Sequence, residues 1–310
     1  MRVLNKLIIF ALLFVGISSV TARSWKLFEK VDIWKSVPQN KTSHSYIYAL
    51  KPENVLGGEK NPCPEALNPP LKGFAAIIAP GGSYHHLGIF HEGIDVAKWF
   101  AKNGVNAFML RYRVAGDGYS HPAMLEDIQR AIQLIRENAD EWNIDPSKIG
   151  AIGFSAGGHL VAMAGAFGDK ENELEKLGIK TTVSLKPDFV MPIYPVVSMQ
   201  DDIGHQWSRK SLIGKNPDQA LKDKFSLELQ IPKDMCPVFL LTNKDDRTVM
   251  YENSQRLAKA LKDANVSHVY YLGEHGDHGF GMGNNKVVQE SQWHERLLKP
   301  WLISLGVMAE

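Results

Sequence analysis

The sequence places a serine in a setting that favours nucleophilic chemistry. Residues 153–157 read Gly-Phe-Ser-Ala-Gly, a G-x-S-x-G pentapeptide centred on Ser155. An apolar strand-like run at 148–153 precedes it, and a small-residue helical segment from Ala156 to about Ala166 follows. This strand–turn–helix context is what the motif requires, because the serine must project from a sharp turn in which glycines make room for crowded backbone. The pattern predicts that Ser155 is a nucleophile; an ordinary glycine-rich turn is the alternative.

A serine hydroxyl is a poor nucleophile unless a base accepts its proton. The loop after a strand expected at 268–272 reads Gly-Glu-His-Gly-Asp-His-Gly-Phe and offers two histidines. We favour His278, which begins a His-Gly-Phe triplet, and keep His275 as the rival. The sequence therefore predicts a general base in the last loop of the chain's strand series.

The histidine in turn needs a carboxylate that fixes its tautomer and stabilises the imidazolium. Two adjacent acids follow a strand expected at 238–242, and we prefer Asp246 over Asp245 for this role. The other acid is expected to cap the following turn or helix. The resulting chain order of serine, aspartate and histidine differs from the order in chymotrypsin and in subtilisin.

A tetrahedral oxyanion needs backbone N–H donors that already point at it. The first is expected from Ala156, which follows the nucleophile, and the second from the loop Pro-Gly-Gly-Ser-Tyr at 80–84. In that loop we favour Gly82, with Gly81 or Ser83 assisting, because glycine lets backbone approach a substrate closely. The side chains expected to bind substrate are Ser83, Tyr84 and His85, and we expect His86 to lie with His85 at the rim of the site.

These loops are joined by alternating strands and helices. Such alternation predicts an α/β fold with a mostly parallel sheet, whose ligand sites lie beyond the carboxyl ends of the strands. The strand-like runs lie at 45–50, 74–79, 105–112, 148–153, 189–196, 238–242 and 268–272; the helical patterns lie at 92–103, 121–142, 156–166, 252–264 and 290–304.

Bulk composition is ordinary for a globular protein. The chain has 310 residues, 44% hydrophobic and 22% charged, and 35 lysines and arginines against 34 acids give a net charge of +1. A chain of this length can form a large core, and we expect one domain over 23–310. The charge balance gives no reason to expect nucleic acid as a partner.

The first residues resemble an export signal. Residues 1–6 carry Arg2 and Lys6, residues 7–20 are almost wholly apolar, and Val-Thr-Ala ends at position 22. This order is typical of a secretory signal peptide over 1–22, and the apolar run is short for a membrane span. We expect a secreted or periplasmic protein without stable membrane association after cleavage; an uncleaved N-terminal anchor is the alternative.

Neither cysteines nor metal ligands form a recognisable motif. Cys63 and Cys236 are the only cysteines, and we expect them to be unpaired, although an exported protein allows a disulfide between them. His85, His86 and His91 lie close in sequence, but no acid or cysteine cluster completes a metal site. We expect no metal. The charged stretch 199–232, which contains Trp207, is expected either to cover the site as a lid or wall or to form a solvated helical excursion.

Longer segments resemble a known family. Three segments resemble the bacterial branch of α/β-hydrolases that includes carbohydrate acetyl esterases and feruloyl-type esterases. They are APGGSY at 79–84, HPAMLEDIQRAIQLIR at 121–136 and KPDFVMPIYPVVSM at 186–199. The likeness extends over nearly all of the chain after residue 22 through four further segments: HEGIDVAKWF, IGFSAGGHL, DDRTV and HGDHGF. Two departures stand out: Ser83 replaces a glycine common in relatives, which keeps its N–H, and His85–His86 replace smaller residues, which affects the shape of the substrate pocket.

The resemblance implies an α/β-hydrolase fold, no metal or organic cofactor, and a triad of Ser155, Asp246 and His278 with Gly82 and Ala156 as oxyanion donors. It implies hydrolysis of acyl esters, with acetyl expected, on plant polysaccharide or oligosaccharide. Feruloyl esters, or other carboxyl esters as in lipases, are the alternative substrates, and a peptidase of this fold is less consistent with the chain. A dead scaffold that only binds carbohydrate is the non-enzymatic alternative, and no glycosidase carboxylate pair is identifiable.

Overall fold

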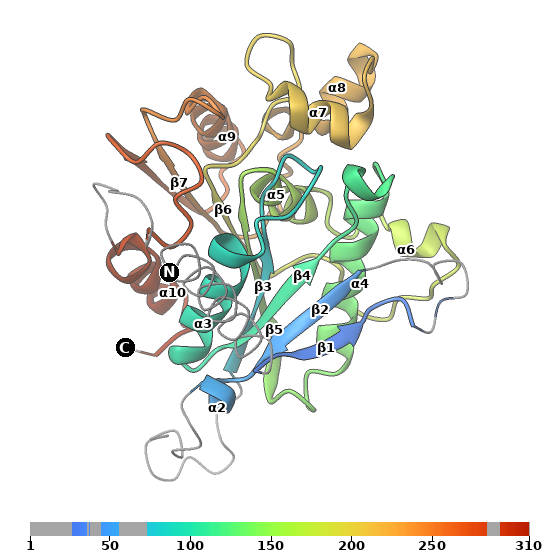
Figure 1. Ribbon diagram of the computed structural model, residues 1–310, viewed down its shortest axis with the longest axis vertical. Helices are drawn as coiled ribbons and strands as arrows, with labels where there is room; N and C mark the ends of the chain where they lie inside the picture. Colours follow the sequence, from blue (N-terminus) through green and yellow to red (C-terminus); the bar gives the residue numbers. More distant parts are fainter. Residues whose placement is uncertain (1–26, 36, 38–44, 56–72, 284–291, 310) are drawn as a thin grey trace, which may run out of the picture.

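The computed structural model describes residues 27–35, 37, 45–55, 73–283 and 292–309 (Figure 1). The expected signal segment 1–22 and Cys63 lie outside this part of the chain. Described strands form one eight-stranded sheet in the order β1-β2-β4-β3-β5-β6-β7-β8. The strands are β1 (Glu29–Asp32), β2 (Tyr46–Leu50), β3 (Gly73–Ala79), β4 (Asn106–Arg111), β5 (Ile144–Phe154), β6 (Phe189–Ile193), β7 (Val238–Asn243) and β8 (His268–Gly273).

The direction of the strands matches the expected α/β architecture. Parallel pairing joins β4, β3, β5, β6, β7 and β8, whereas β2 runs antiparallel to both β1 and β4. The prediction of a mostly parallel sheet is therefore confirmed. The carboxyl ends of β3, β5, β7 and β8 meet at one edge, where the loops that carry the candidate residues begin.

Helices cover both faces of the sheet because successive strand residues point to opposite sides. On β3, Ala75 and Ile77 belong to a core with α4 (Ala123–Glu137), α5 (Ala156–Phe167) and α9 (Glu252–Asp263). Phe74 and Ile78 belong to a second core with α3 (Asp95–Lys102) and α10 (Lys299–Ser304). Figure 1 shows α3 and α10 together on one side of the sheet. The strands carry apolar residues on both faces, as expected for buried parallel strands.

Remaining described elements are short and lie in the connections. They are α2 (Pro52–Val55), η2 (Phe90–Ile94), η3 (Ala115–Asp117), α6 (Glu173–Lys176), α7 (Gln206–Ile213), α8 (Gln219–Phe225), η4 (Leu227–Leu229) and η5 (His294–Leu298). In Figure 1, α7 and α8 lie at the top of the molecule, beyond the carboxyl ends of the strands. The stretch 199–232 is thus a helical excursion on the side of the sheet where the candidate residues lie.

Several expected boundaries are wrong by a few residues, and one strand was not expected. The helix expected to reach Trp142 ends at Glu137, where the Asn138 side chain donates to the Leu134 carbonyl and the chain turns back toward β5. The final helix, expected from 290, is described as η5 followed by α10. Strand β1 has the charged sequence Glu-Lys-Val-Asp, which carries no hydrophobic signal because it is a largely exposed edge strand.

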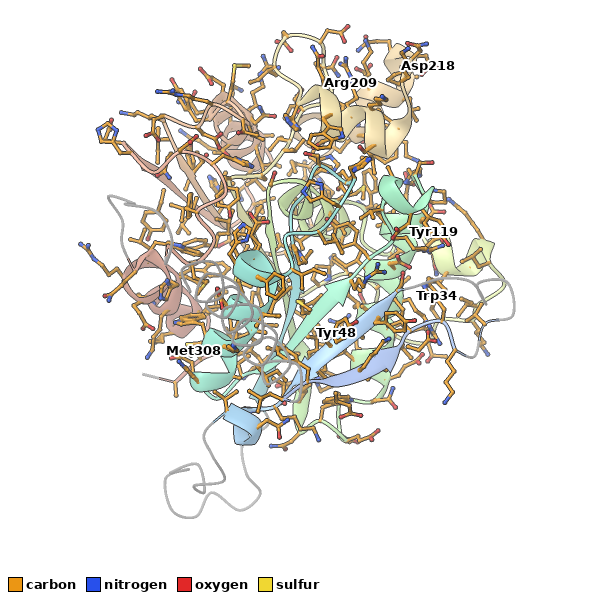
Figure 2. All side chains as sticks on the ribbon, in the orientation of Figure 1. Trp34, Tyr48, Tyr119, Arg209, Asp218 and Met308 are labelled. Atoms are coloured by element: carbon orange, nitrogen blue, oxygen red, sulfur yellow. The ribbon has the colours of Figure 1, made fainter. Side chains whose placement is uncertain are left out.

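A buried polar cluster ties this edge to the helix layer. The Asp127 carboxylate on α4 accepts hydrogen bonds from Trp34 Nε1 (2.6 Å), Ser45 Oγ (2.8 Å) and Arg113 Nε (3.0 Å). The Arg113 guanidinium lies over the rings of Trp34 and Tyr119, two residues that Figure 2 labels on this side of the molecule. Because the buried carboxylate is paired and hydrogen-bonded, its burial is compensated.

Candidate active site

Ser155 lies on a strained turn between β5 and α5. Its backbone has φ 53° and ψ −117°, in the region that L-residues rarely adopt. Two close approaches require glycine around it: a Cβ on Gly153 would lie 2.1 Å from the Gly157 carbonyl oxygen, and one on Gly157 would lie 2.0 Å from that of Ala79. The turn packs against the end of β3 and sends the serine side chain toward the loops.

The structure brings Ser155, His278 and Asp246 together. His278 Nε2 lies 2.9 Å from Ser155 Oγ, and His278 Nδ1 lies 2.7 Å from Asp246 Oδ2. The Asp246 side chain is fully buried and that of His278 is 13% exposed. Because the carboxylate only accepts, Nδ1 carries the proton and Nε2 is left to accept the serine proton. This geometry allows a serine–histidine proton transfer.

The two neighbouring acids of the 245–246 pair divide their tasks differently from the expectation. Asp246 itself holds the following turn, since its Oδ1 accepts the amides of Thr248 (2.9 Å) and Val249 (2.8 Å). The idea that the other acid caps this turn is therefore wrong. Asp245 instead accepts hydrogen bonds from the amides of Gly276 (3.2 Å) and Asp277 (2.8 Å). Both amides belong to the loop after β8 that contains His278, which we call the histidine loop.

The rival base, His275, is not placed for the same chemistry. Its side chain is 74% exposed, and its Nδ1 lies 3.6 Å from an Asp245 oxygen. The contact is a surface pair at the outer side of the loop. The loop thus presents His278 to the serine and His275 to solvent.

Two amides remain available for an oxyanion. Within the described part of the chain, the N–H groups of Gly82 and Ala156 have no protein acceptor. Ala156 begins α5, so its amide belongs to the positive end of that helix. Gly82 has φ 130°, and a Cβ there would lie 2.2 Å from the His86 carbonyl oxygen, so the loop needs glycine at this position.

The expectation that Gly81 assists as an oxyanion donor is wrong. Its amide donates to Glu92 Oε2 at 2.8 Å and is therefore engaged inside the protein. Gly81 lies against the nucleophile all the same, because a Cβ there would lie 2.9 Å from Ser155 Cβ. Gly81 supports the loop, while Ser83, the other assisting residue we considered, has an amide without a protein acceptor in the described ranges.

Glu92 connects this loop to the histidine loop, a role the sequence did not reveal. Its Oε1 accepts the Tyr194 hydroxyl at 2.7 Å, and the Tyr194 oxygen accepts the amide of Gly281 at 3.0 Å. The Tyr194 ring lies edge-on to His278, with centroids 4.8 Å apart. Burial, followed by the negative charge of Glu92, raises the pKa of Tyr194 well above its usual value, so the hydroxyl remains a donor. The carboxylate thus fixes one loop on each side of Ser155.

The expectation that the Tyr84 side chain binds substrate is also wrong. Tyr84 is fully buried, and its hydroxyl lies 2.8 Å from His159 Nδ1. The left-handed backbone at Ser83 and Tyr84, each with φ 57°, turns the tyrosine inward. His159 Nε2 donates to the Phe225 carbonyl at 2.9 Å, so His159 is a packed helix residue, as we expected.

The outer wall of the site is aromatic. His85 and His86 are exposed, as the expected position at the rim requires. Their rings contact that of Trp207, with centroids 5.4 Å and 5.7 Å apart. Trp207 lies on α7, whose N-cap is His205. Ser83, which precedes the buried Tyr84, is 9% exposed. The 199–232 excursion therefore contacts the residues that follow Gly82 through Trp207 of α7.

Comparison with known proteins identifies the family of this chain. Residues 76–261, more than half of the chain, match the BD-FAE family. The chain belongs to this family. The resemblance to esterases of the α/β-hydrolase fold, first seen in short segments, is confirmed.

Two relatives of this BD-FAE protein have names connected with xylan. An acetylxylan esterase of Xylanibacter ruminicola is 29% identical over 245 residues, which are 77% of this chain and 47% of that protein. The endo-1,4-beta-xylanase B of Butyrivibrio fibrisolvens is 35% identical over 223 residues, 71% of this chain and 34% of that protein. The chain thus spans about half, or less, of the length of these relatives.

Solved structures match nearly their whole length. An acetyl ester-xyloside bifunctional hydrolase from Caldicellulosiruptor lactoaceticus has a TM-score of 0.74 and 31% identity, covering 91% of this chain and 97% of that one. The esterase Est2 of Thermogutta terrifontis has a TM-score of 0.72 and 21% identity, covering 92% and 97%, and supports the fold alone.

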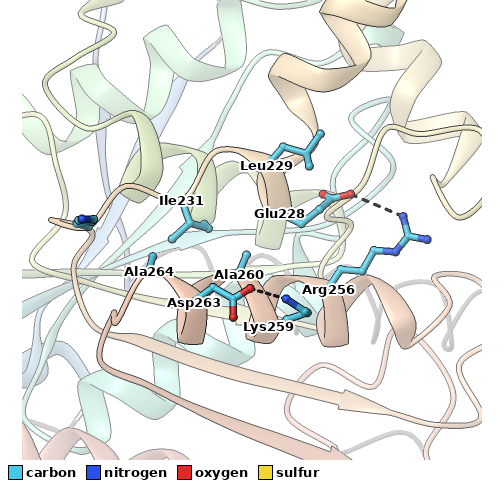
Figure 3. Close-up of a pocket in the computed structure, with 9 residues that line it drawn as sticks. Glu228, Leu229, Ile231, Arg256, Lys259, Ala260, Asp263 and Ala264 are labelled. Atoms are coloured by element: carbon cyan, nitrogen blue, oxygen red, sulfur yellow. Dashed lines mark hydrogen bonds and ion pairs between the residues drawn. The ribbon is translucent and has the colours of Figure 1, made fainter.

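Other features of the described chain lie outside this arrangement. A hollow lies between η4 and α9 and is lined by Glu228, Leu229 and Arg256 among others (Figure 3). Ser155, Asp246 and His278 are not among the residues that line it. No group of three or more histidines, cysteines or acids among the described residues is arranged to hold a metal ion. None of the described helices is long and apolar enough to span a bilayer. Cys236 is buried, which raises the pKa of its thiol to about 12.

Proposed function

We propose that this BD-FAE protein is a serine esterase that hydrolyses acetyl esters on plant polysaccharide or its oligosaccharides. The observation that carries the proposal is the alignment of Ser155 Oγ, His278 Nε2 and Asp246 through contacts of 2.9 Å and 2.7 Å. The acetyl group and the xylan-type sugar come from the names of the acetylxylan esterase and the acetyl ester-xyloside hydrolase.

In the first half-reaction, Ser155 Oγ attacks the ester carbonyl carbon while His278 Nε2 takes the hydroxyl proton. The carbonyl oxygen becomes an oxyanion that the amides of Gly82 and Ala156 hold. The bond from carbon to the sugar oxygen then breaks, and His278 returns its proton to that oxygen. An acetyl-serine and a free sugar hydroxyl result.

In the second half-reaction, water attacks the acyl carbon and gives a proton to His278. The bond to Ser155 Oγ breaks, the serine regains its proton from His278, and the product leaves as acetic acid, which loses its proton to solvent. Asp246 stays ionised throughout and stabilises the imidazolium through the Nδ1 hydrogen bond. No step needs a metal or an organic cofactor.

The proposal is tested by acetate release from acetylated xylan and xylo-oligosaccharides, compared with turnover of methyl ferulate. We expect acetate release, and we expect Ser155→Ala to reduce kcat by about 10⁴-fold or more, as removal of a triad member does. A loss smaller than about 100-fold would contradict the nucleophile assignment. Turnover of ferulate without acetate release would replace acetyl by feruloyl as the acyl group.

Export belongs to the same proposal, because polymeric xylan is met outside the cytoplasm. The segment 1–22 has the order of a signal peptide. We expect the full chain, expressed in a Gram-negative host, to be recovered from the periplasm or medium with a new N-terminus after Ala22. Recovery of the intact chain in the membrane fraction would favour an anchor instead.

A further inference from the structure

Trp207 is a large apolar side chain left in solvent. It is 48% exposed, although burial of a tryptophan would be strongly favourable. Two more exposed rings, His85 and His86, lie against it at interplanar angles of 47° and 45°, and their own centroids are 6.3 Å apart. We call these three residues the aromatic platform. It joins two connections far apart in sequence and offers ring surface to solvent.

The platform is adjacent to the loop at 80–84 that contains Gly82, which we call the oxyanion loop. The amides of His85 and His86 donate to the Gly82 carbonyl at 2.9 Å and 3.0 Å, which closes a turn. Such a turn keeps the Cα atoms of Gly82 and His85 within about 7 Å. His85 and His86 therefore stand within one turn of the Gly82 amide, the candidate oxyanion donor.

The helix that carries Trp207 begins within electrostatic reach of His278. Its N-cap, His205, has a pKa lowered by burial and then by the charge of His278, with Asp246 acting in the opposite direction. The leaving alcohol takes its proton from His278, so α7 begins near the group that protonates the alcohol.

The chemistry of the platform fits a sugar ring. A pyranose has one face of C–H groups, which pairs with the electron-rich face of an aromatic ring, and an edge of hydroxyls. Imidazole nitrogens offer both a donor and an acceptor to such hydroxyls. No lysine or arginine takes part in the ring contacts of the platform, which suits a neutral ligand rather than a carboxylate or phosphate.

We propose that Trp207, His85 and His86 bind the sugar ring whose hydroxyl carries the acyl group, an assignment that rests on the proposed function. The platform then raises activity toward esters of sugars over esters of small alcohols with the same acyl group. Trp207 is a specificity-determining residue in this scheme and takes no part in the bond changes at Ser155.

The test compares Trp207→Ala with the unaltered chain on two acetates, an acetylated xylo-oligosaccharide and ethyl acetate. Ethyl acetate carries no ring, so it does not use the platform. We expect kcat/KM to fall about tenfold for the sugar acetate and less than about twofold for ethyl acetate. Leu229→Ala is the matched control, since Leu229 is also exposed and lies on the same 199–232 stretch but lines the hollow of Figure 3.

Equal losses on both acetates would mean that Trp207 supports the fold of the site, and no loss on either would mean that the platform binds nothing; each result overturns the proposal. A second experiment separates this proposal from the proposed function: calorimetry measures the binding of unacetylated xylotriose to the Ser155→Ala variant. Binding that Trp207→Ala weakens about tenfold supports the platform even if the active chain releases no acetate from sugars, a result that would overturn only the function.

Discussion

The carboxylate of Glu92 accepts the hydroxyl of Tyr194 at 2.7 Å, across 102 residues of sequence. Its other oxygen accepts the Gly81 amide at 2.8 Å, so the two oxygens serve two donors in a buried setting. Only a carboxylate can accept at both positions, because a glutamine offers one acceptor and one donor. The Glu92 carboxylate therefore links the oxyanion loop to Tyr194 and, through it, to the histidine loop.

Glu92→Gln tests this positioning role. In this variant, either the Gly81 N–H or the Tyr194 O–H faces the amide NH₂ of the glutamine, which cannot accept a hydrogen bond. We therefore expect the oxyanion loop to shift. Misplacement of about 1 Å costs on the order of 100-fold in rate, so we expect kcat to fall by about 10- to 100-fold while KM changes little. The measurement is steady-state kinetics on ethyl acetate and a sugar acetate, together with a thermal melt of the variant.

Tyr194→Phe is the companion variant. It removes the hydroxyl that donates to Glu92 Oε1 and accepts from the Gly281 amide, so both of these hydrogen bonds are lost. We expect a loss of similar direction on both substrates. Unchanged kcat in both variants, with a lower melting temperature, would show that the Glu92–Tyr194 contact stabilises the fold without positioning the site.

The sequence predicted the residues at strand ends better than the contacts between loops. Ser155, Asp246 and His278 were identifiable because each follows a strand, and parallel strands bring such ends to one edge. Glu92 and Tyr194 gave no comparable signal, since their contact depends on how η2 packs beside the end of β6. Gly81 was misassigned for the same reason, because Glu92 engages its amide, and Tyr84 was misassigned because a left-handed turn sends it inward.

The exposed wall was only partly predictable. His85 and His86 stood out as a departure from related sequences, and the structure places them at the rim. The pairing with Trp207 was not predictable, because the 199–232 stretch reads equally well as a lid or as a solvated helix. Its position depends on long-range contacts such as the bond from the His121 amide to the Leu212 carbonyl, 2.9 Å long.

The adjacent acids Asp245 and Asp246 allow a matched comparison. Asp246→Asn leaves the histidine without the acceptor that fixes its tautomer, and we expect kcat to fall by about 10³- to 10⁴-fold. Asp245→Asn keeps one acceptor oxygen for the loop amides of Gly276 and Asp277, and we expect a loss below about 100-fold, since a hydrogen bond to a charged group contributes about 1.5–3 kcal/mol. Initial rates with p-nitrophenyl acetate measure both. A larger loss from Asp245→Asn than from Asp246→Asn would reverse the two roles.

Buried histidines make the stability of the fold depend on pH. His159 is fully buried, accepts from Tyr84 at Nδ1 and donates to Phe225 at Nε2, so its neutral form is satisfied. Burial lowers its pKa from 6.5 to about 4, and burial also lowers that of His121 to about 4. In the unfolded chain both histidines take up protons near pH 6.5, so between about pH 6.5 and 4 the unfolded state binds more protons. Stability is therefore full above this range and falls as the pH falls through it.

His159→Gln isolates one of these two groups. A glutamine accepts from Tyr84 and donates to Phe225 without titrating, and a buried histidine contributes at most about 1.4 kcal/mol of lost stability per pH unit. We expect urea unfolding of the unaltered chain to show a clear loss between about pH 7.5 and 5, and His159→Gln to show a smaller one. His275→Gln, at an exposed position, serves as the control and is expected to follow the unaltered chain. A pH dependence that His159→Gln leaves unchanged would show that His159 does not resist protonation in the folded protein.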